Sequence, residues 1–287
     1  MRPNLTMHPV RGVELAVWEW PGDGPPVLFA HATGFHGRVW DEVIRRVPGR
    51  RAISVDLRGH GRSGKPPAPY CWTEFGRDLA QLAELLGIRD ALGVGHSMGG
   101  HAVTLAAAVR PHTFASLLLL DPVIFAPEVY GRRRDDAAYI AKRRNEWASP
   151  GEMIERFRPR PPFAQWRPEV LRDYCEYGLL PAGDRFVLAC PPEIEASIYA
   201  ASGTHASDIH ACLEKVDAPV TVVRGGIPWN MEKFDLAASP TDPRLASQFP
   251  NGRDVLLEGR SHYIPMETPE YVAEMVTSLP AAERMNR

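Results

Sequence analysis

The chain has 287 residues, 44% of them hydrophobic and 24% charged, which is enough for one large α/β domain with an insertion or for two ordinary domains. A formal net charge of −2 argues against nucleic acid or an anionic membrane as a partner. No apolar run approaches the roughly 20 residues that cross a bilayer, and the first residues lack the apolar core of a signal peptide. The 4 cysteines have neither metal-type spacing nor the density of a disulfide framework. We therefore expect a cytoplasmic protein with reduced thiols that acts on a small molecule, and we leave open whether it forms a homo-oligomer.

Short apolar runs alternate with helical patterns along the first part of the chain. The partly alternating segment from Val13 to Trp20 predicts an early antiparallel strand followed by a turn. Later apolar runs are typical of strands buried on both faces, at residues 26–30, 51–55, 91–95 and 117–120. Helical patterns separate these runs, at residues 40–47, 75–86 and 98–109. Strands and helices in this alternation predict a parallel sheet with right-handed crossovers.

The alternation stops after Asp121. The next ninety or so residues have helical segments, loops, many aromatic residues and clustered prolines, but no run typical of a buried strand. Strand patterns return at residues 219–223 and 254–257, and a last helix is predicted to begin near Thr268 with proline at its first position. We therefore predict one α/β core domain in two pieces and one helical cap insertion, at residues 1–121 with 212–287 and at residues 122–211.

The segment Gly95-His96-Ser97-Met98-Gly99 lies where a predicted strand changes abruptly into a predicted helix. Such a turn lifts a serine hydroxyl above the edge of a sheet, as in a nucleophile elbow. The turn crowds the backbone two residues to either side of the serine, so the missing Cβ atoms of Gly95 and Gly99 suit these positions. The free N–H groups at the start of the helix would face a developing anion. Because the pattern GxSxG alone is short, its meaning depends on the rest of the chain.

Three further motifs accompany it. They are the loop that begins His31-Ala32-Thr33-Gly34, a DxRGxGxS segment from Asp56 to Ser63, and a late Gly-Arg-Ser-His that ends at His262. In this order the four motifs resemble the α/β-hydrolase superfamily over nearly the whole chain, and most closely its capped, esterase-like members. The resemblance implies a mostly parallel central sheet flanked by helices, with a helical cap inserted after the sixth strand. The motifs would then lie together at the carboxyl edge of the sheet, where ligands bind in open α/β folds.

The resemblance also implies roles for single residues. Ser97 matches the nucleophile and His262 the base that takes its proton. Oxyanion donors would be the backbone N–H groups of Met98 and Thr33, with Ala32 where family members usually have glycine. Three other histidines match supporting positions, beneath the elbow, in the oxyanion loop and in the glycine-rich turn: His96, His31 and His60.

In this family an acidic residue completes the catalytic triad with the serine and the histidine, and this third residue is harder to place. Many family members carry it a few residues after the strand predicted at 219–223, but no carboxylate stands at that distance here. Other members carry it at the end of the preceding strand, where this chain has Asp121. We predict Asp121 as the acid that orients His262, with Asp235 as the alternative.

The expected activity is hydrolysis of a carboxylic ester of a small, largely apolar substrate through an acyl-enzyme. A serine at the elbow argues against haloalkane dehalogenases and epoxide hydrolases, which use aspartate there. One alternative is a carbon–carbon bond hydrolase or lyase with the same triad, which would need polar residues near Ser97, such as Arg156, Arg158 or Arg167. Another is a non-catalytic small-ligand receptor on the same fold. No ligand cluster or phosphate-binding glycine loop indicates a metal or a cofactor, and we expect neither.

Overall fold

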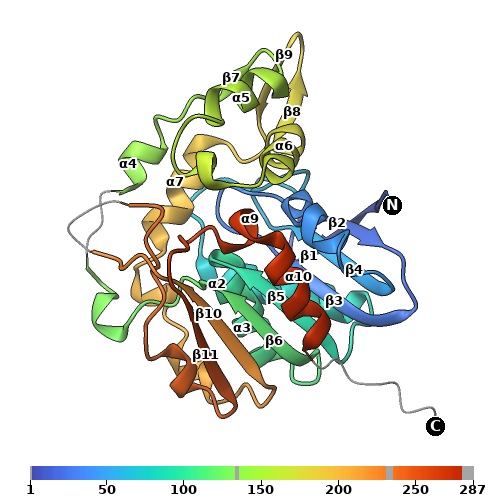
Figure 1. Ribbon diagram of the computed structural model, residues 1–287, viewed down its shortest axis with the longest axis vertical. Helices are drawn as coiled ribbons and strands as arrows, with labels where there is room; N and C mark the ends of the chain where they lie inside the picture. Colours follow the sequence, from blue (N-terminus) through green and yellow to red (C-terminus); the bar gives the residue numbers. More distant parts are fainter. Residues whose placement is uncertain (1, 133–135, 231–234, 280–287) are drawn as a thin grey trace.

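The computed structural model describes residues 2–132, 136–230 and 235–279, and Figure 1 shows their arrangement. One eight-stranded sheet forms its centre. The strands of this sheet are β1 (Asn4–Val10), β2 (Val13–Trp20), β3 (Gly24–Ala30), β4 (Arg50–Asp56), β5 (Ala91–His96), β6 (Phe114–Leu120), β10 (Val220–Gly225) and β11 (Gly252–Leu257).

The spatial order of the strands is β1-β2-β4-β3-β5-β6-β10-β11. β1 and β2 pair antiparallel, as do β2 and β4, and all remaining neighbours are parallel. The predicted mostly parallel sheet is therefore confirmed, and so is the antiparallel strand at Val13–Trp20. The sequence reading did not include β1, an edge strand whose residues are mostly exposed and which therefore lacks an apolar run.

The central strands of the sheet are buried on both faces, which explains their continuous apolar runs, whereas the edge strands β1 and β11 are largely exposed. Along β6, Leu117 and Leu119 belong to the core on one face, while Leu118 and Leu120 belong to the core on the other. This is the alternation expected of a strand.

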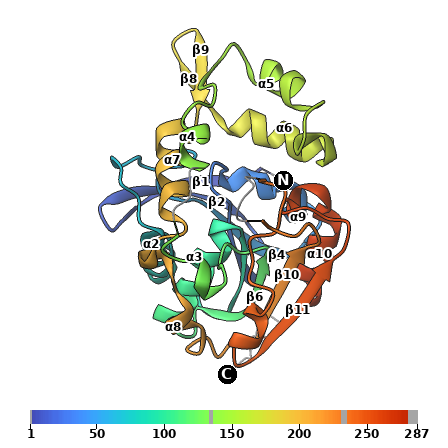
Figure 2. The same cartoon turned by 90° about the vertical axis from the view of Figure 1, so that its left-hand side faces the viewer.

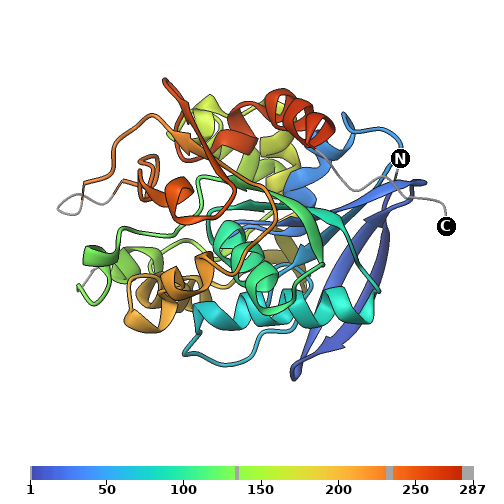
Figure 3. The same ribbon diagram turned by 90° about the horizontal axis from the view of Figure 1, so that it is seen from below.

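Helices cover both faces of the sheet, and Figure 3 shows them as outer layers. α2 (Trp72–Leu85) and α3 (Met98–Val109) pack on one face, and α1 (Asp41–Ile44) and α10 (Pro269–Ser278) on the other. The predicted helix at 98–109 and the start of the last helix at Pro269 are confirmed. The helix predicted at 40–47 is shorter, because the 3₁₀ turn η1 (Gly37–Trp40) comes before it. The remaining short elements of the core are η5 (Leu245–Gln248) and α9 (Ile264–Glu267).

The inserted segment, residues 122–211, follows the sixth strand and lies largely beyond one end of the sheet (Figures 1 and 2). Its helical elements are η2 (Pro127–Val129), α4 (Asp136–Ile140), α5 (Pro150–Phe157), η3 (Phe163–Gln165), α6 (Pro168–Tyr177), α7 (Pro192–Ala201), η4 (His205–Ser207) and the start of α8 (His210–Leu213).

The inserted segment is not purely helical, and in this respect the prediction is wrong. β7 (Glu146–Trp147), β9 (Arg185–Leu188) and β8 (Leu179–Ala182) form a small antiparallel sheet. These strands have two to four residues and bury few of their side chains, so they leave no recognisable alternation in the sequence. Among the described residues, no helix is long and apolar enough to span a bilayer.

Candidate active site

The turn between β5 and α3 holds Ser97 at φ 57° and ψ −120°, a backbone conformation that residues other than glycine rarely adopt. A Cβ atom at Gly95 would overlap the carbonyl oxygen of Gly99, and one at Gly99 would overlap that of Ala30. The expectation that both positions need glycine is therefore confirmed. The strained turn raises the Ser97 side chain at the carboxyl edge of the sheet.

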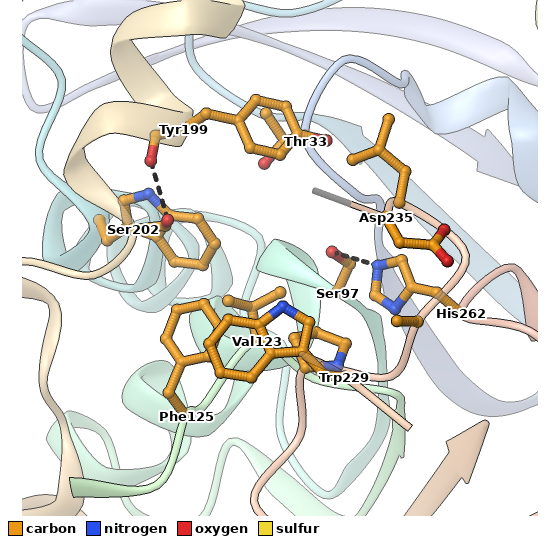
Figure 4. A pocket seen from close by; sticks show the side chains of 13 residues that line it. Thr33, Ser97, Val123, Phe125, Tyr199, Ser202, Trp229, Asp235 and His262 are labelled. Atoms are coloured by element: carbon orange, nitrogen blue, oxygen red, sulfur yellow. Dashed lines mark hydrogen bonds between the residues drawn. The ribbon is translucent and has the colours of Figure 1, made fainter. Parts of the chain in front are cut away.

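The imidazole of His262, in the loop after β11, lies between two other polar side chains. Its Nδ1 is 2.7 Å from Oδ2 of Asp121. Its Nε2 is 3.0 Å from Oγ of Ser97, a contact that Figure 4 shows as a dashed line. A carboxylate only accepts hydrogen bonds, so Nδ1 carries the proton that Asp121 binds. Nε2 is then unprotonated and accepts the hydrogen bond of the Ser97 hydroxyl. The three residues thus form one directed chain of hydrogen bonds.

Asp121 is fully buried at the end of β6, and four donors satisfy its carboxylate. The imidazole donates to its Oδ2. Its Oδ1 accepts from three donors: the N–H of Gly225 at 3.1 Å, the hydroxyl of Ser239, and the hydroxyl of Thr241 at 3.2 Å. Sequence reasoning missed both hydroxyl groups, because an isolated serine or threonine in a loop carries no signal. Together these donors hold a buried charge that would otherwise be costly.

The alternative acid, Asp235, lies in a different position. It is exposed, it lines the pocket above Ser97, and its Oδ1 accepts a hydrogen bond from the N–H of Ala237 at 2.9 Å. The carbonyl of Ala237 in turn accepts from the N–H of His262 at 2.8 Å. The structure therefore brings Asp121, and not Asp235, to Nδ1 of the imidazole.

Two buried histidines hold the loop that contains Thr33. The N–H of Leu57 donates to Nε2 of His31, whose Nδ1 donates to the carbonyl of Ala32 at 2.7 Å. The N–H of Gly34 donates to Nε2 of His60 at 3.0 Å. Both rings must be neutral to accept these bonds, and burial accordingly lowers the pKa of His31 far below its usual value and that of His60 to about 4.

Neither predicted oxyanion donor is used elsewhere. Within the described parts of the chain, the backbone N–H groups of Thr33 and Met98 have no protein acceptor. Ala32, which stands where glycine is usual, does not have a positive φ, so its methyl group causes no backbone strain. The hydroxyl of Thr33 donates to Sδ of Met98 at 3.4 Å, which joins the two segments.

His96 lies beneath the elbow. Its Nε2 donates to the backbone carbonyl of His262 at 2.9 Å, and the two ring centroids are 5.0 Å apart. Burial, together with the neighbouring His262, holds the pKa of His96 well below its usual value. A neutral His96 therefore positions the backbone that carries the second imidazole.

A narrow pocket of about 50 Å³ opens onto Ser97 and His262 (Figure 4). Its remaining lining is mainly apolar and comes from both the core and the inserted segment: Thr33, Trp72, Val123, Phe125, Tyr199, Ser202, Trp229, Asp235, Leu236, Ala238 and Pro240. No arginine is among the described residues of this lining. Of the three arginines named from the sequence, Arg158 pairs with Glu155 and Arg167 with Glu270, and Arg156 lines a neighbouring cavity.

In the described residues, no group of three or more His, Cys, Asp or Glu side chains is arranged to hold a metal ion. The chemistry available at the site is that of a hydrogen-bonded hydroxyl, an imidazole, a buried carboxylate and two unoccupied N–H donors.

The model of the Alpha/beta hydrolase family matches residues 27–275, and the chain therefore belongs to this family. Over 262 residues it is 26% identical to the 2-(acetamidomethylene)succinate hydrolase of Mesorhizobium japonicum, an alignment that covers 90% of this chain and 88% of that protein. It is also 35% identical over 102 residues to a putative non-heme haloperoxidase of Mycobacterium phage D29. This alignment covers only 35% of this chain and 37% of that protein.

The fold is also found among solved structures. The crystal structure of E-2-(acetamidomethylene)succinate hydrolase superposes with a TM-score of 0.77 and 23% sequence identity, over 96% of this chain and 98% of that one. At this identity the likeness shows a shared fold.

Proposed function

We propose that the protein is a serine hydrolase that cleaves a carboxylic ester, with Ser97 as nucleophile, His262 as general base and Asp121 as the acid that orients it. The observation that carries the proposal is the continuous hydrogen-bond chain from the Ser97 hydroxyl through both ring nitrogens of His262 to a buried carboxylate. A serine hydroxyl is a weak nucleophile and needs such a base.

The reaction would begin when Oγ of Ser97 attacks the ester carbonyl carbon and His262 Nε2 takes the hydroxyl proton. The imidazolium that forms is stabilised by the Asp121 charge at Nδ1. The tetrahedral intermediate then collapses, its C–O bond breaks, and Nε2 returns the proton to the departing alcohol. A water molecule, activated by the same nitrogen, hydrolyses the acyl-enzyme and restores Ser97.

The N–H groups of Met98 and Thr33 would bind the oxyanion of both tetrahedral intermediates. Their lack of another acceptor in the described residues supports this role, because they need no rearrangement before the reaction. Each such donor typically contributes about 2.7–4 kcal/mol of transition-state stabilisation.

We further propose that residues 122–211 act as a cap domain on a core of residues 1–121 and 212–287. Tyr199 and Ser202 of the inserted segment line the Ser97 pocket, which supports a role in covering the substrate. No arginine is among the described residues that line the pocket at Ser97, so an acid group directly beside the scissile bond, as in a keto acid that undergoes carbon–carbon cleavage, would have no positive partner there, which favours an ester.

Turnover of short 4-nitrophenyl esters and labelling with a fluorophosphonate probe test the proposal. The wild-type protein should hydrolyse the esters and become labelled at Ser97, since the probe reacts with activated serines. Ser97→Ala should reduce both signals to the level of a buffer control.

Ser202→Ala provides a matched serine substitution in the same pocket and should keep the labelling at Ser97. A wild-type protein that neither hydrolyses these esters nor reacts with the probe would contradict the proposal and favour the non-catalytic receptor.

A further inference from the structure

A second and larger cavity adjoins the Ser97 pocket. Its volume is about 330 Å³, against about 50 Å³ for the Ser97 pocket, and the two share Thr33, Tyr199 and Leu236 in their walls. Small-molecule sites commonly have volumes of about 300–1,000 Å³. The Ser97 pocket by itself therefore accommodates only the reacting group, and the second cavity offers room for the remainder of a substrate.

The second cavity carries an excess of positive charge. Four arginines and one glutamate line it: Arg143, Arg144, Arg156, Arg160 and Glu195. Two of the arginines already have carboxylate partners, because Arg143 pairs with Glu195 and Arg144 with Glu152 at 2.7 Å.

Arg156 and Arg160 are different. Among the residues that the structure describes, neither guanidinium has a salt-bridge or hydrogen-bond partner. Arg156 lies on α5, and Arg160 follows three residues after the end of that helix. Both arginines are exposed, and the charge of Arg156 is partly compensated by nearby Glu152, so both guanidinium groups can donate hydrogen bonds to a ligand in the cavity. Guanidinium groups bind carboxylates through paired hydrogen bonds.

Aromatic side chains of the inserted segment also line this cavity. Phe157 and Phe163 stack with their centroids 4.3 Å apart, and Trp166 packs edge-on against Phe163 at 4.8 Å. Trp166 also contacts Tyr263, the residue next to His262, with the ring centroids 5.3 Å apart. Arg156 and Arg160 line the second cavity but not the Ser97 pocket, so a ligand that reaches from Ser97 to these arginines would also contact the aromatic side chains.

We propose that the substrate is an ester that ends in a carboxylate, with its carbonyl at Ser97, an apolar body along the aromatic wall, and the carboxylate bound by Arg156 and Arg160. The position of the ester carbonyl at Ser97 rests on the proposed serine hydrolase function. The cavity thus selects a substrate by the charge at the end remote from the reaction.

The experiment compares two series of substrates. One series consists of the monoethyl esters of linear dicarboxylic acids of increasing chain length, and the other of the corresponding ethyl ester amides, which have the same size but no charge. The wild-type protein should prefer the carboxylate at one chain length by tenfold or more in kcat/KM, as expected for a charged hydrogen bond. Added salt should reduce the preference.

The double variant Arg156→Gln/Arg160→Gln should lose the preference through a higher KM for the monoesters, so that the two series give similar values of kcat/KM. The control is Arg158→Gln/Arg172→Gln, which removes the same charge from exposed positions outside the cavity wall and should behave as wild type. Equal rates on both series, or equal behaviour of the two double variants, would overturn the proposal.

A binding measurement separates this proposal from the function of Ser97. Calorimetric titration of Ser97→Ala with the linear dicarboxylates should give binding that Arg156→Gln/Arg160→Gln abolishes in the same background. If the wild-type protein hydrolyses no ester but this binding is observed, the serine hydrolase function fails and the carboxylate subsite stands. If no dicarboxylate binds, the carboxylate subsite is overturned, whatever the esterase activity.

Discussion

At the scale of single residues, Asp121 shows how position determines chemical role. It ends a central strand, is fully buried, has a φ of 45°, and lies with Oδ2 2.7 Å from Nδ1 of His262. Asp235 has the same side chain but is exposed and bonds its own loop at Ala237. Only the buried carboxylate can select the tautomer in which Nε2 is free to accept the proton of Ser97.

This difference makes a direct prediction. Asp121→Asn keeps the shape of the side chain but presents an amide, which favours the wrong tautomer, so kcat on short esters should fall by roughly 10⁴-fold, as in a serine protease. Asp235→Asn should remain within a few-fold of wild type. Steady-state kinetics of the two variants decides the matter, and the reverse ranking would exclude Asp121 as the acid.

At the scale of secondary-structure elements, α7 connects the inserted segment to the oxyanion loop. Glu195 on this helix is buried and pairs with Arg143, whose Nη2 also donates to the hydroxyl of Tyr174 at 3.3 Å. A Cβ atom at Gly34 would overlap the Glu195 carboxylate, so the helix and the loop are in close contact. The pair joins two parts of the inserted segment and holds the Glu195 carboxylate against Gly34, next to Thr33.

Removing the charge of Glu195 should destabilise this connection. Glu195→Gln leaves Arg143 without its partner, and breaking a buried pair in this way typically costs about 3–5 kcal/mol. The lower end is expected because the Arg143 side chain remains 22% exposed. Urea unfolding measures the loss, and Glu193→Gln, an exposed change on the same helix, should leave the free energy of unfolding nearly unchanged. Equal effects of the two changes would contradict the role of the pair.

At the scale of the whole molecule, five buried histidines among the described residues link stability to pH. Burial, as the main cause, lowers the pKa of each of them, to about 4 for His60 and His101, below the usual value for His36, and well below it for His31 and His96. The unfolded chain therefore binds protons that the folded chain does not accept. The stability that these groups contribute is fully present above their unfolded pKa of 6.5 and is lost as the pH falls toward 4.

We predict that the free energy of unfolding falls steeply between pH 6.5 and pH 4. His101 accounts for about 3 kcal/mol of this fall, the equivalent of its pKa change, and its Nε2 donates to the carbonyl of Ser207 away from the proposed active site. Urea titrations across this pH range should show that the free energy of unfolding of His101→Gln changes less with pH than that of the wild type. His205→Gln, at an exposed histidine, should retain the wild-type slope. Parallel slopes for wild type and His101→Gln would refute the linkage.

The parallel strands of the central sheet and the elbow could be predicted from the amino-acid sequence. Strands buried on both faces must be continuously apolar, so β3, β4, β5 and β6 are visible as short runs. The elbow is visible because a tight strand-to-helix turn tolerates only glycine at Gly95 and Gly99. These are local constraints, and a local pattern records them.

Which side chains meet at the site depends on how distant segments of the chain pack together. Asp121 and His262 are 141 residues apart, and the order of β6, β10 and β11 in the sheet brings them together. The hydroxyls of Ser239 and Thr241, the small sheet of the inserted segment and the arginines of the second cavity likewise depend on packing between distant segments. Such contacts follow from how elements are arranged in space, and no periodicity along the chain records that arrangement.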